Sequence, residues 1–150
     1  KMKRRELAAL SDHLYAIGDI AAPIASGSFR TAGMIVAPCS VHSMSQIATG
    51  VTENLLTRAA DVCLKEKRPL ILMVRETPLH VGHLRSLTQL AEMGAIIAPP
   101  LPAFYADPKS IQDLIDYSVG RVLDHLGFDW PIKRWGEAGG LAKSRRKAKA

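Results

Sequence analysis

Three short, uninterrupted apolar runs punctuate the sequence, and the segments between them have helical periodicity. The runs occupy residues 33–37 (GMIVA), 69–74 (PLILMV) and 95–98 (AIIA). Runs of this length without polar residues are typical of strands covered on both faces, as in a parallel sheet. Parallel neighbours need a crossover, which the intervening helices can provide. We therefore expect an α/β fold with the architecture of a three-layer sandwich.

The periodicity predicts three helices, at residues 53–67, 80–93 and 111–126. The last has the clearest pattern, because its apolar residues recur at the spacing of a single helix face, which we expect to be buried. Ser110 with Asp113 predicts a capping box at its start, and Gly127 predicts its end.

Length and charge indicate one domain with a basic tail. The 150 residues suit a single domain, expected at 1–136, followed by a tail at 137–150. The formal net charge of +6 belongs to that tail, because its last eight residues hold five of the 20 basic groups and the rest is nearly neutral. A solvated tail is therefore favoured over an RNA-binding one, and no nucleic-acid partner is expected.

The setting is expected to be cytoplasmic. No apolar run approaches the roughly 20 residues that cross a bilayer, so no membrane span is expected. Cys39 and Cys63 lie among apolar residues, which is typical of reduced thiols. Nothing around Cys39 predicts the lowered pKa that a thiol nucleophile needs.

The residues that follow each predicted strand are the candidates for a site, because ligands in such sheets bind beyond the carboxyl ends of the strands. After the first strand, Ser40 and Ser43 offer hydroxyls at a helix start, which suits an anion or a flavin edge and equally suits simple helix capping. After the second strand come Arg75 and Glu76, which could form an ion pair or a proton-transfer group. After the third, Tyr105 is either held by prolines to present its hydroxyl or packed as a loop aromatic.

Basic residues on two helices extend this candidate site. Arg58 and Lys65 lie seven apart on one helix, and Arg121 follows Tyr117 by four on another. Each pair alone would be a solvated face. Together with Arg75 and Tyr105, these cations could hold a phosphate-bearing substrate.

The usual nucleotide and metal motifs do not occur in the sequence. It has neither GxGxxG nor GxxxxGK[ST]. His80 and His83 form an H-x-x-H pair without an evident third ligand, so we interpret them as polar or capping residues and expect no metal.

Four separate stretches resemble the UbiX flavin prenyltransferase family. They are ASGSFRTAGMIVAPCS, LLTRAADVCLKEKRPLILMVRETPLHVGHL, GAIIAPPLPAFYADP and VGRVLDHLG, and KRWGE is similar to the family's C-terminal end. The resemblance implies a Rossmann-like, flavodoxin-like flavoprotein domain that binds FMN and assembles as a homo-oligomer, typically a trimer-based dodecamer. It implies transfer of a dimethylallyl group from dimethylallyl phosphate to N5 and C6 of reduced FMN. The prenylated FMN would serve a UbiD-type decarboxylase, in ubiquinone biosynthesis or on aromatic acids.

The resemblance also assigns roles to individual residues. It implies catalytic roles for Ser40 and Glu76, with Glu76 as the acid/base candidate. The residues implied to contact FMN are Ser40, Val41, His42, Ser43 and Arg75. The residues implied to hold the substrate are Tyr105, Arg121, Lys65, Arg58 and Trp135. Arg58 and Lys65 are expected to be shared across subunits, and Trp135 is expected to close over the site.

One part of the family pattern has no counterpart. The family opens with a strand and a glycine- and serine-containing turn that holds FMN, and we expect both to be missing from this sequence. Two alternatives to an active prenyltransferase stay open. One is a non-catalytic FMN-binding accessory subunit of an aromatic-acid decarboxylase, and the other is a basic-tailed scaffold that only oligomerises.

Overall fold

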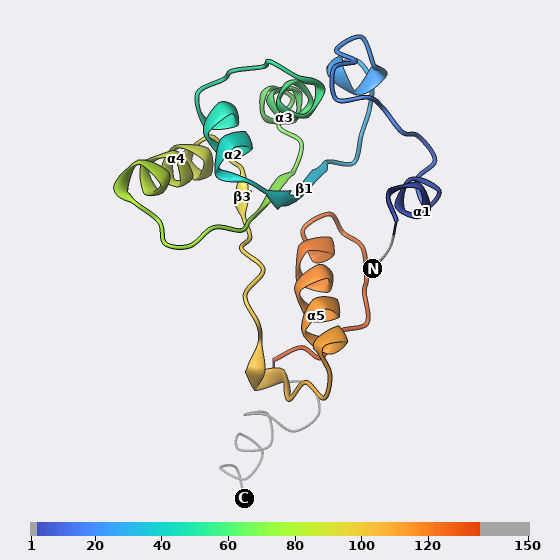
Figure 1. The fold of residues 1–150 in the computed structure, drawn as a ribbon, viewed down its shortest axis with the longest axis vertical. Coiled ribbons are helices and arrows are strands. Elements are labelled where there is room, and N and C mark those ends of the chain that lie inside the picture. The colour runs from blue at the N-terminus through green and yellow to red at the C-terminus, as the bar shows by residue number, and fades with distance from the viewer. Residues whose placement is uncertain (1–2, 136–150) are drawn as a thin grey trace, which may run out of the picture. The chain divides into compact units, whose positions relative to one another are not determined.

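The computed structural model describes residues 3–135, which group into two compact units divided between Ile97 and Ala98 (Figure 1). The predicted tail at 137–150 lies outside the described residues. The first unit contains α1 (Arg4–Ala8), η1 (Pro23–Ala25), β1 (Met34–Cys39), α2 (Val41–Ala48), α3 (Leu55–Lys65), β2 (Leu70–Val74), α4 (Val81–Glu92) and β3 (Ile96–Ile97). The second contains η2 (Phe104–Ala106) and α5 (Ile111–Asp124).

The three strands form one parallel sheet in the order β1-β2-β3, as the apolar runs predict. Met34 pairs with Leu70, and Ile71 pairs with Ile96. The first strand is longer than the apolar run, because it continues through Pro38 with a register shift to reach Cys39. The third strand is shorter than predicted.

The core of the first unit lies between this sheet and its helices. Alternate residues of β1 and β2, such as Val36 and Leu72, are buried against Met44 of α2 and Leu90 of α4. This alternation follows from the two-residue period of a strand, which places every second side chain on one face. Figure 1 shows α2, α3 and α4 gathered beside the strands.

Polar caps fix where the helices of this unit begin. Ser40 caps α2 and Asn54 caps α3. In a capping box, the Asn54 side chain accepts from the backbone N–H of Thr57, and the backbone N–H of Asn54 donates to the Thr57 hydroxyl. His80 caps α4 by accepting hydrogen bonds from the backbone N–H groups of Gly82 and His83. The interpretation of His80 as a capping residue is therefore confirmed.

The second unit is built around α5. The helix begins at the predicted capping box of Ser110 and Asp113 and ends at Asp124, three residues before Gly127. The expectation that its apolar stripe is buried holds at Val122, which is 4% exposed, but not at Ile111 and Ile115, which are 77% and 49% exposed. Periodicity reports that a helix has an apolar face, but it does not report what covers that face.

The segment that follows α5 packs on a different face of the helix, at Gly120. A Cβ atom on Gly120 would lie 2.4 Å from Cγ2 of Ile132 and 3.0 Å from Cδ1 of Trp130. The segment after the helix therefore packs directly on the backbone of α5, where only glycine leaves room. This packing positions the residues at 132–135 beside the helix.

Candidate functional site

The carboxyl ends of β1 and β2 lie side by side. Cys39 is the register partner of Val74, and the backbone N–H of Arg75 donates to the carbonyl oxygen of Cys39 at 3.2 Å. The residues that immediately follow the two strands, Ser40 and Arg75, therefore start from the same edge of the sheet. This is the edge at which the sequence predicts ligand contacts.

At this edge, Ser40 begins α2 as its N-cap. Its Oγ accepts a hydrogen bond from the backbone N–H of Ser43 at 3.2 Å and lies 3.3 Å from the Ser43 hydroxyl. The capping interpretation is therefore confirmed. Val41 and His42 occupy the first turn of α2, where backbone N–H groups have no partner within the helix. Two hydroxyls and a helix start together form a donor set suited to an anion or a flavin edge.

Arg75 and Glu76 are both exposed at the end of β2. The Glu76 carboxylate accepts a hydrogen bond from the backbone N–H of Thr77 at 3.0 Å. Within residues 3–135, the structure contains no ion pair between Arg75 and Glu76. Both charged groups are thus presented at the sheet edge, and neither neutralises the other.

Both thiols are unsuited to nucleophilic chemistry. Cys39 is fully buried, and burial raises the pKa of its thiol to about 11. Burial also raises the pKa of Cys63, although the positive charge of Arg68 and a hydrogen bond with Thr31 oppose the shift. A thiol whose pKa lies far above neutrality is almost entirely protonated, which agrees with the expectation that Cys39 is not activated.

The structure gives Arg58 and Lys65 partners within the first unit. Arg58 donates from Nε to the carbonyl oxygen of Ala25 at 3.2 Å and pairs with Asp61 at 3.0 Å. Lys65 pairs with Glu66 near the amino end of β2, whereas Arg75 follows its carboxyl end. Within one chain, Lys65 is therefore not brought to the edge that carries Ser40 and Arg75.

In the second unit, Tyr105 contacts two other aromatic residues. Its hydroxyl is hydrogen-bonded to the hydroxyl of Tyr117 on α5, and the two rings are edge-on at 5.8 Å. The ring of Trp135 meets Tyr105 edge-on at 5.2 Å. The hydrogen bond to Tyr105 is also the main reason why the pKa of Tyr117 is raised, so its phenol stays protonated at neutral pH.

Two arginines meet on one carboxylate beside these rings. Asp124 accepts from Nη1 of Arg121 at 2.6 Å and from Nη1 and Nη2 of Arg134 at 2.7 and 2.8 Å. Hydrogen bonds from Arg134, followed by its charge and by the contacts of Arg121, lower the pKa of Asp124 to about 2. The carboxylate is therefore ionised throughout the neutral range.

These aromatic and cationic residues enclose a cavity of about 310 Å³, which we call the Tyr105 cavity. Its lining residues are Tyr105, Tyr117, Arg121, Ile132, Arg134 and Trp135. The structure thus brings together three residues predicted to hold the substrate, Tyr105, Arg121 and Trp135. Sequence reasoning did not assign Tyr117 and Arg134 to the site. The available signals were the spacing of Tyr117 four residues before Arg121, and the position of Arg134 next to Trp135.

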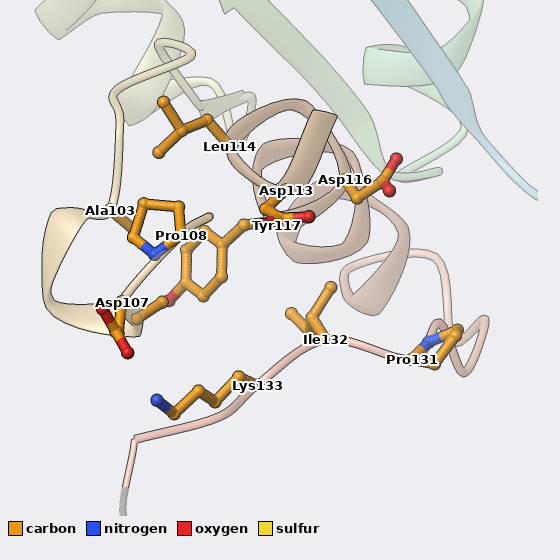
Figure 2. A pocket seen from close by; sticks show the side chains of 11 residues that line it. Ala103, Asp107, Pro108, Asp113, Leu114, Asp116, Tyr117, Pro131, Ile132 and Lys133 are labelled. Carbon is orange, nitrogen blue, oxygen red and sulfur yellow. The ribbon is translucent and has the colours of Figure 1, made fainter. Parts of the chain in front are cut away.

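A second cavity, of about 240 Å³, shares Tyr117 and Ile132 with the Tyr105 cavity. Figure 2 shows the ring of Tyr117 between Pro108 and Ile132 in this second cavity. Two of its acidic residues are already engaged locally, because Asp107 pairs with Lys109 and Asp113 caps α5. These two carboxylates therefore serve the turn before α5.

The part of the chain that the structure describes contains no group of three metal-ligating side chains. Within the same residues, no helix is both long enough and apolar enough to cross a membrane.

Comparison with known proteins gives consistent matches. Residues 10–123 match the family model described as Flavoprotein. Flavin prenyltransferase UbiX of Escherichia coli (strain K12) is 55% identical over 134 residues, which cover 87% of this chain and 71% of that protein. Flavin prenyltransferase UbiX of Thauera aromatica is 54% identical over 143 residues, covering 93% of this chain and 74% of the relative.

Two solved structures are similar over most of the chain. The crystal structure of AnUbiX (PadA1) in complex with FMN and dimethylallyl pyrophosphate has a TM-score of 0.88 and 48% identity, and the match covers 90% of this chain and 72% of that one. The dodecameric FMN-dependent UbiX-like decarboxylase from Escherichia coli O157:H7 has a TM-score of 0.87 and 46% identity, covering 89% and 73% respectively.

Proposed function

The chain belongs to the flavoprotein family, among its UbiX flavin prenyltransferases, and on that premise we propose that it joins the dimethylallyl group of dimethylallyl phosphate to reduced FMN. It is a prenyltransferase that uses FMN. The observation that supports this substrate best is the Tyr105 cavity, where two guanidinium groups and two phenol hydroxyls surround one space. Guanidinium groups match phosphate oxygens in geometry and charge.

The sheet edge fits the flavin. The edge offers several hydrogen-bond donors, which are the hydroxyls of Ser40 and Ser43, the helix start at Val41 and His42, and the guanidinium of Arg75. These residues would hold FMN through hydrogen bonds and charge. Reduced FMN supplies the electron-rich N5 and C6 atoms to which the dimethylallyl group becomes attached.

The Tyr105 cavity would hold and activate the phosphate ester. As the allylic C–O bond breaks, negative charge builds up on the departing phosphate oxygens. Arg121 and the Tyr105 hydroxyl are fixed donors that stabilise this charge more in the transition state than in the ground state. The ring of Trp135 would exclude water and place an aromatic face near the allylic cation.

Formation of the second bond would require addition of a proton to the double bond of the attached dimethylallyl group and loss of a proton from C6. The Glu76 carboxylate is exposed at the sheet edge and accepts a hydrogen bond from Thr77, so it can accept a proton from a group bound there. The departing phosphate is the other available base. Ser40, on the adjacent strand exit, would orient the flavin for this step through its hydroxyl.

Arg58 and Lys65 are proposed to act from a neighbouring copy of the chain. Within one copy, Lys65 lies near the amino end of β2. A homo-oligomer would let these cations reach the phosphate of a second copy, and a trimer-based dodecamer is the assembly we propose, as one relative is described as dodecameric.

A UbiD-type decarboxylase is the proposed recipient of the product, in a cytoplasmic setting suited to the two unpaired thiols.

The test is anaerobic incubation of the full chain with reduced FMN and either dimethylallyl phosphate or dimethylallyl pyrophosphate. Mass spectrometry of the released flavin should show the addition of one dimethylallyl unit with the monophosphate. A chain that binds FMN tightly and leaves it unmodified with both esters would instead be a non-catalytic accessory subunit. A folded chain without flavin affinity would be a scaffold.

A further inference from the structure

One carboxylate organises the cationic wall of the Tyr105 cavity. Oδ2 of Asp124 accepts hydrogen bonds from both Arg121, at 2.6 Å, and Arg134, at 2.7 Å. Oδ1 accepts a second bond from Arg134 at 2.8 Å. The two guanidinium groups are therefore neighbours that share an oxygen atom, although one belongs to α5 and the other to the segment that follows it.

The three side chains of this cluster differ in how far they are exposed. The Asp124 side chain is 18% exposed, whereas that of Arg121 is 50% exposed and that of Arg134 is 33% exposed. Both arginines line the cavity, but Asp124 does not. The carboxylate thus lies behind two cations that face the open space.

Such an arrangement is suited to an anion with two charges. Two guanidinium groups side by side repel each other, and a carboxylate behind them offsets that repulsion while fixing their planes. Each guanidinium carries five N–H donors, and Asp124 accepts a hydrogen bond from one of those on Arg121. The hydroxyls of Tyr105 and Tyr117 add two further polar groups on the same cavity.

We propose that Arg134 is a second substrate-binding cation and that Asp124 is the positioning residue that holds Arg121 and Arg134 together to receive a phosphate dianion. This inference deepens the proposed function, because it assigns two residues to the phosphate end of the same site. Asp124 acts through the arginines and does not touch the substrate. The hydrogen bonds and charge of Arg134 lower the pKa of Asp124 to about 2, so the carboxylate is ionised at neutral pH.

The competing explanation is that Asp124 merely fastens the segment after α5 to the helix. In that case, substitutions of Asp124 would lower the melting temperature, and phosphate affinity would not depend on Arg134. Affinity and thermal stability must therefore be measured separately on each variant.

The experiment is calorimetric titration of the full chain, loaded with FMN, with inorganic phosphate as the probe. We expect Arg134→Gln and Asp124→Asn each to weaken phosphate binding by about tenfold or more, since each loses charge-assisted contacts. Asp124→Glu, which keeps the carboxylate, should recover most of that loss. The matched control is Asp129→Asn, because Asp129 is fully exposed and only reaches Arg134 at 3.7 Å. It should bind phosphate as the unmodified chain does.

Three results would overturn the proposal. They are an unmodified chain that does not bind phosphate, an Arg134→Gln variant that binds it normally, and an Asp124→Asn variant that binds it as well or more tightly. The last would show that the carboxylate only opposes the anion. The titration needs no prenyl transfer, so a chain that binds phosphate as expected but leaves FMN unmodified would contradict the proposed function and leave this inference standing.

Discussion

The hydroxyls of Tyr105 and Tyr117 are hydrogen-bonded to each other, and their rings cross at 86°. Tyr105 belongs to the short helix η2, whereas Tyr117 belongs to α5, so this bond joins two elements across the Tyr105 cavity. It fixes the position of the Tyr105 hydroxyl before any ligand arrives. A donor held in advance costs less to order when the substrate binds.

Tyr117→Phe should therefore weaken binding of dimethylallyl phosphate. The substitution removes the hydroxyl that holds Tyr105 but keeps the volume of the ring. Loss of one neutral hydrogen bond corresponds to about 0.5–1.5 kcal/mol of free energy. Binding of the ester to the FMN-loaded chain can be measured by calorimetry. Tyr15→Phe, in a tyrosine outside the cavity, is the matched control. Equal ester affinity in all three proteins would exclude a role for Tyr117.

Arg121→Ala should weaken the same substrate more strongly. Arg121 lines the cavity with half of its side chain exposed, so its guanidinium can reach the substrate. Loss of one charge-assisted hydrogen bond corresponds to about 1.5–3 kcal/mol of binding free energy. The Michaelis constant for the ester should rise while FMN affinity stays constant. Unchanged affinity for the ester would remove Arg121 from the site.

Glu76→Gln should slow prenyl transfer while FMN remains bound. The amide keeps the size of the side chain and can still accept a hydrogen bond from Thr77, but it cannot take a proton at neutral pH. Single-turnover kinetics would report the transfer step, and flavin fluorescence would report binding. If this variant loses FMN altogether, the acid/base role is wrong and Glu76 is a flavin-binding residue.

Ser40→Ala should have two separable effects. Loss of the N-cap of α2 should lower the free energy of unfolding by about 0.5–2 kcal/mol, and loss of the hydroxyl should lower FMN affinity. Asn54→Ala removes the cap of α3 in the same way, but Asn54 is not among the proposed flavin contacts. Denaturant unfolding and FMN titration of both variants test the difference. A similar FMN affinity in the two variants would limit Ser40 to capping.

Acid should remove the stabilising contribution of Asp124. Its pKa in the folded chain is lowered to about 2 from 3.8, so the folded state favours the charged form. That contribution is present above the unfolded pKa and is lost as the pH falls toward 2. Denaturant unfolding between pH 2 and pH 6 should therefore show a shallower acid-side decline in Asp124→Asn than in the unmodified chain. Identical slopes would mean that the two arginines do not stabilise the carboxylate.

The sequence predicts the local features well, because they depend on neighbouring residues. The apolar run at 69–74 contains β2, and the Ser110–Asp113 pair predicts the start of α5. Both follow from patterns within a few positions of the chain.

The sequence does not predict features that depend on contacts between distant residues. The contact of Arg134 with Asp124 spans ten residues and depends on how the chain returns along α5 past Gly120. The exposure of Ile111 and Ile115 on α5 has the same origin, since periodicity does not specify a covering surface. The identity of the flavin came from the family resemblance, because hydroxyls and an arginine at a sheet edge suit many anions.

The most direct test of the proposed function is a crystal structure of the full chain with FMN and dimethylallyl phosphate under anaerobic conditions. We expect phosphate oxygens within hydrogen-bond distance of the Arg121 guanidinium and the Tyr105 hydroxyl, with the ring of Trp135 over the ester. An ester bound with its phosphate away from both Arg121 and Tyr105, in every copy of the assembly, would contradict the proposed function.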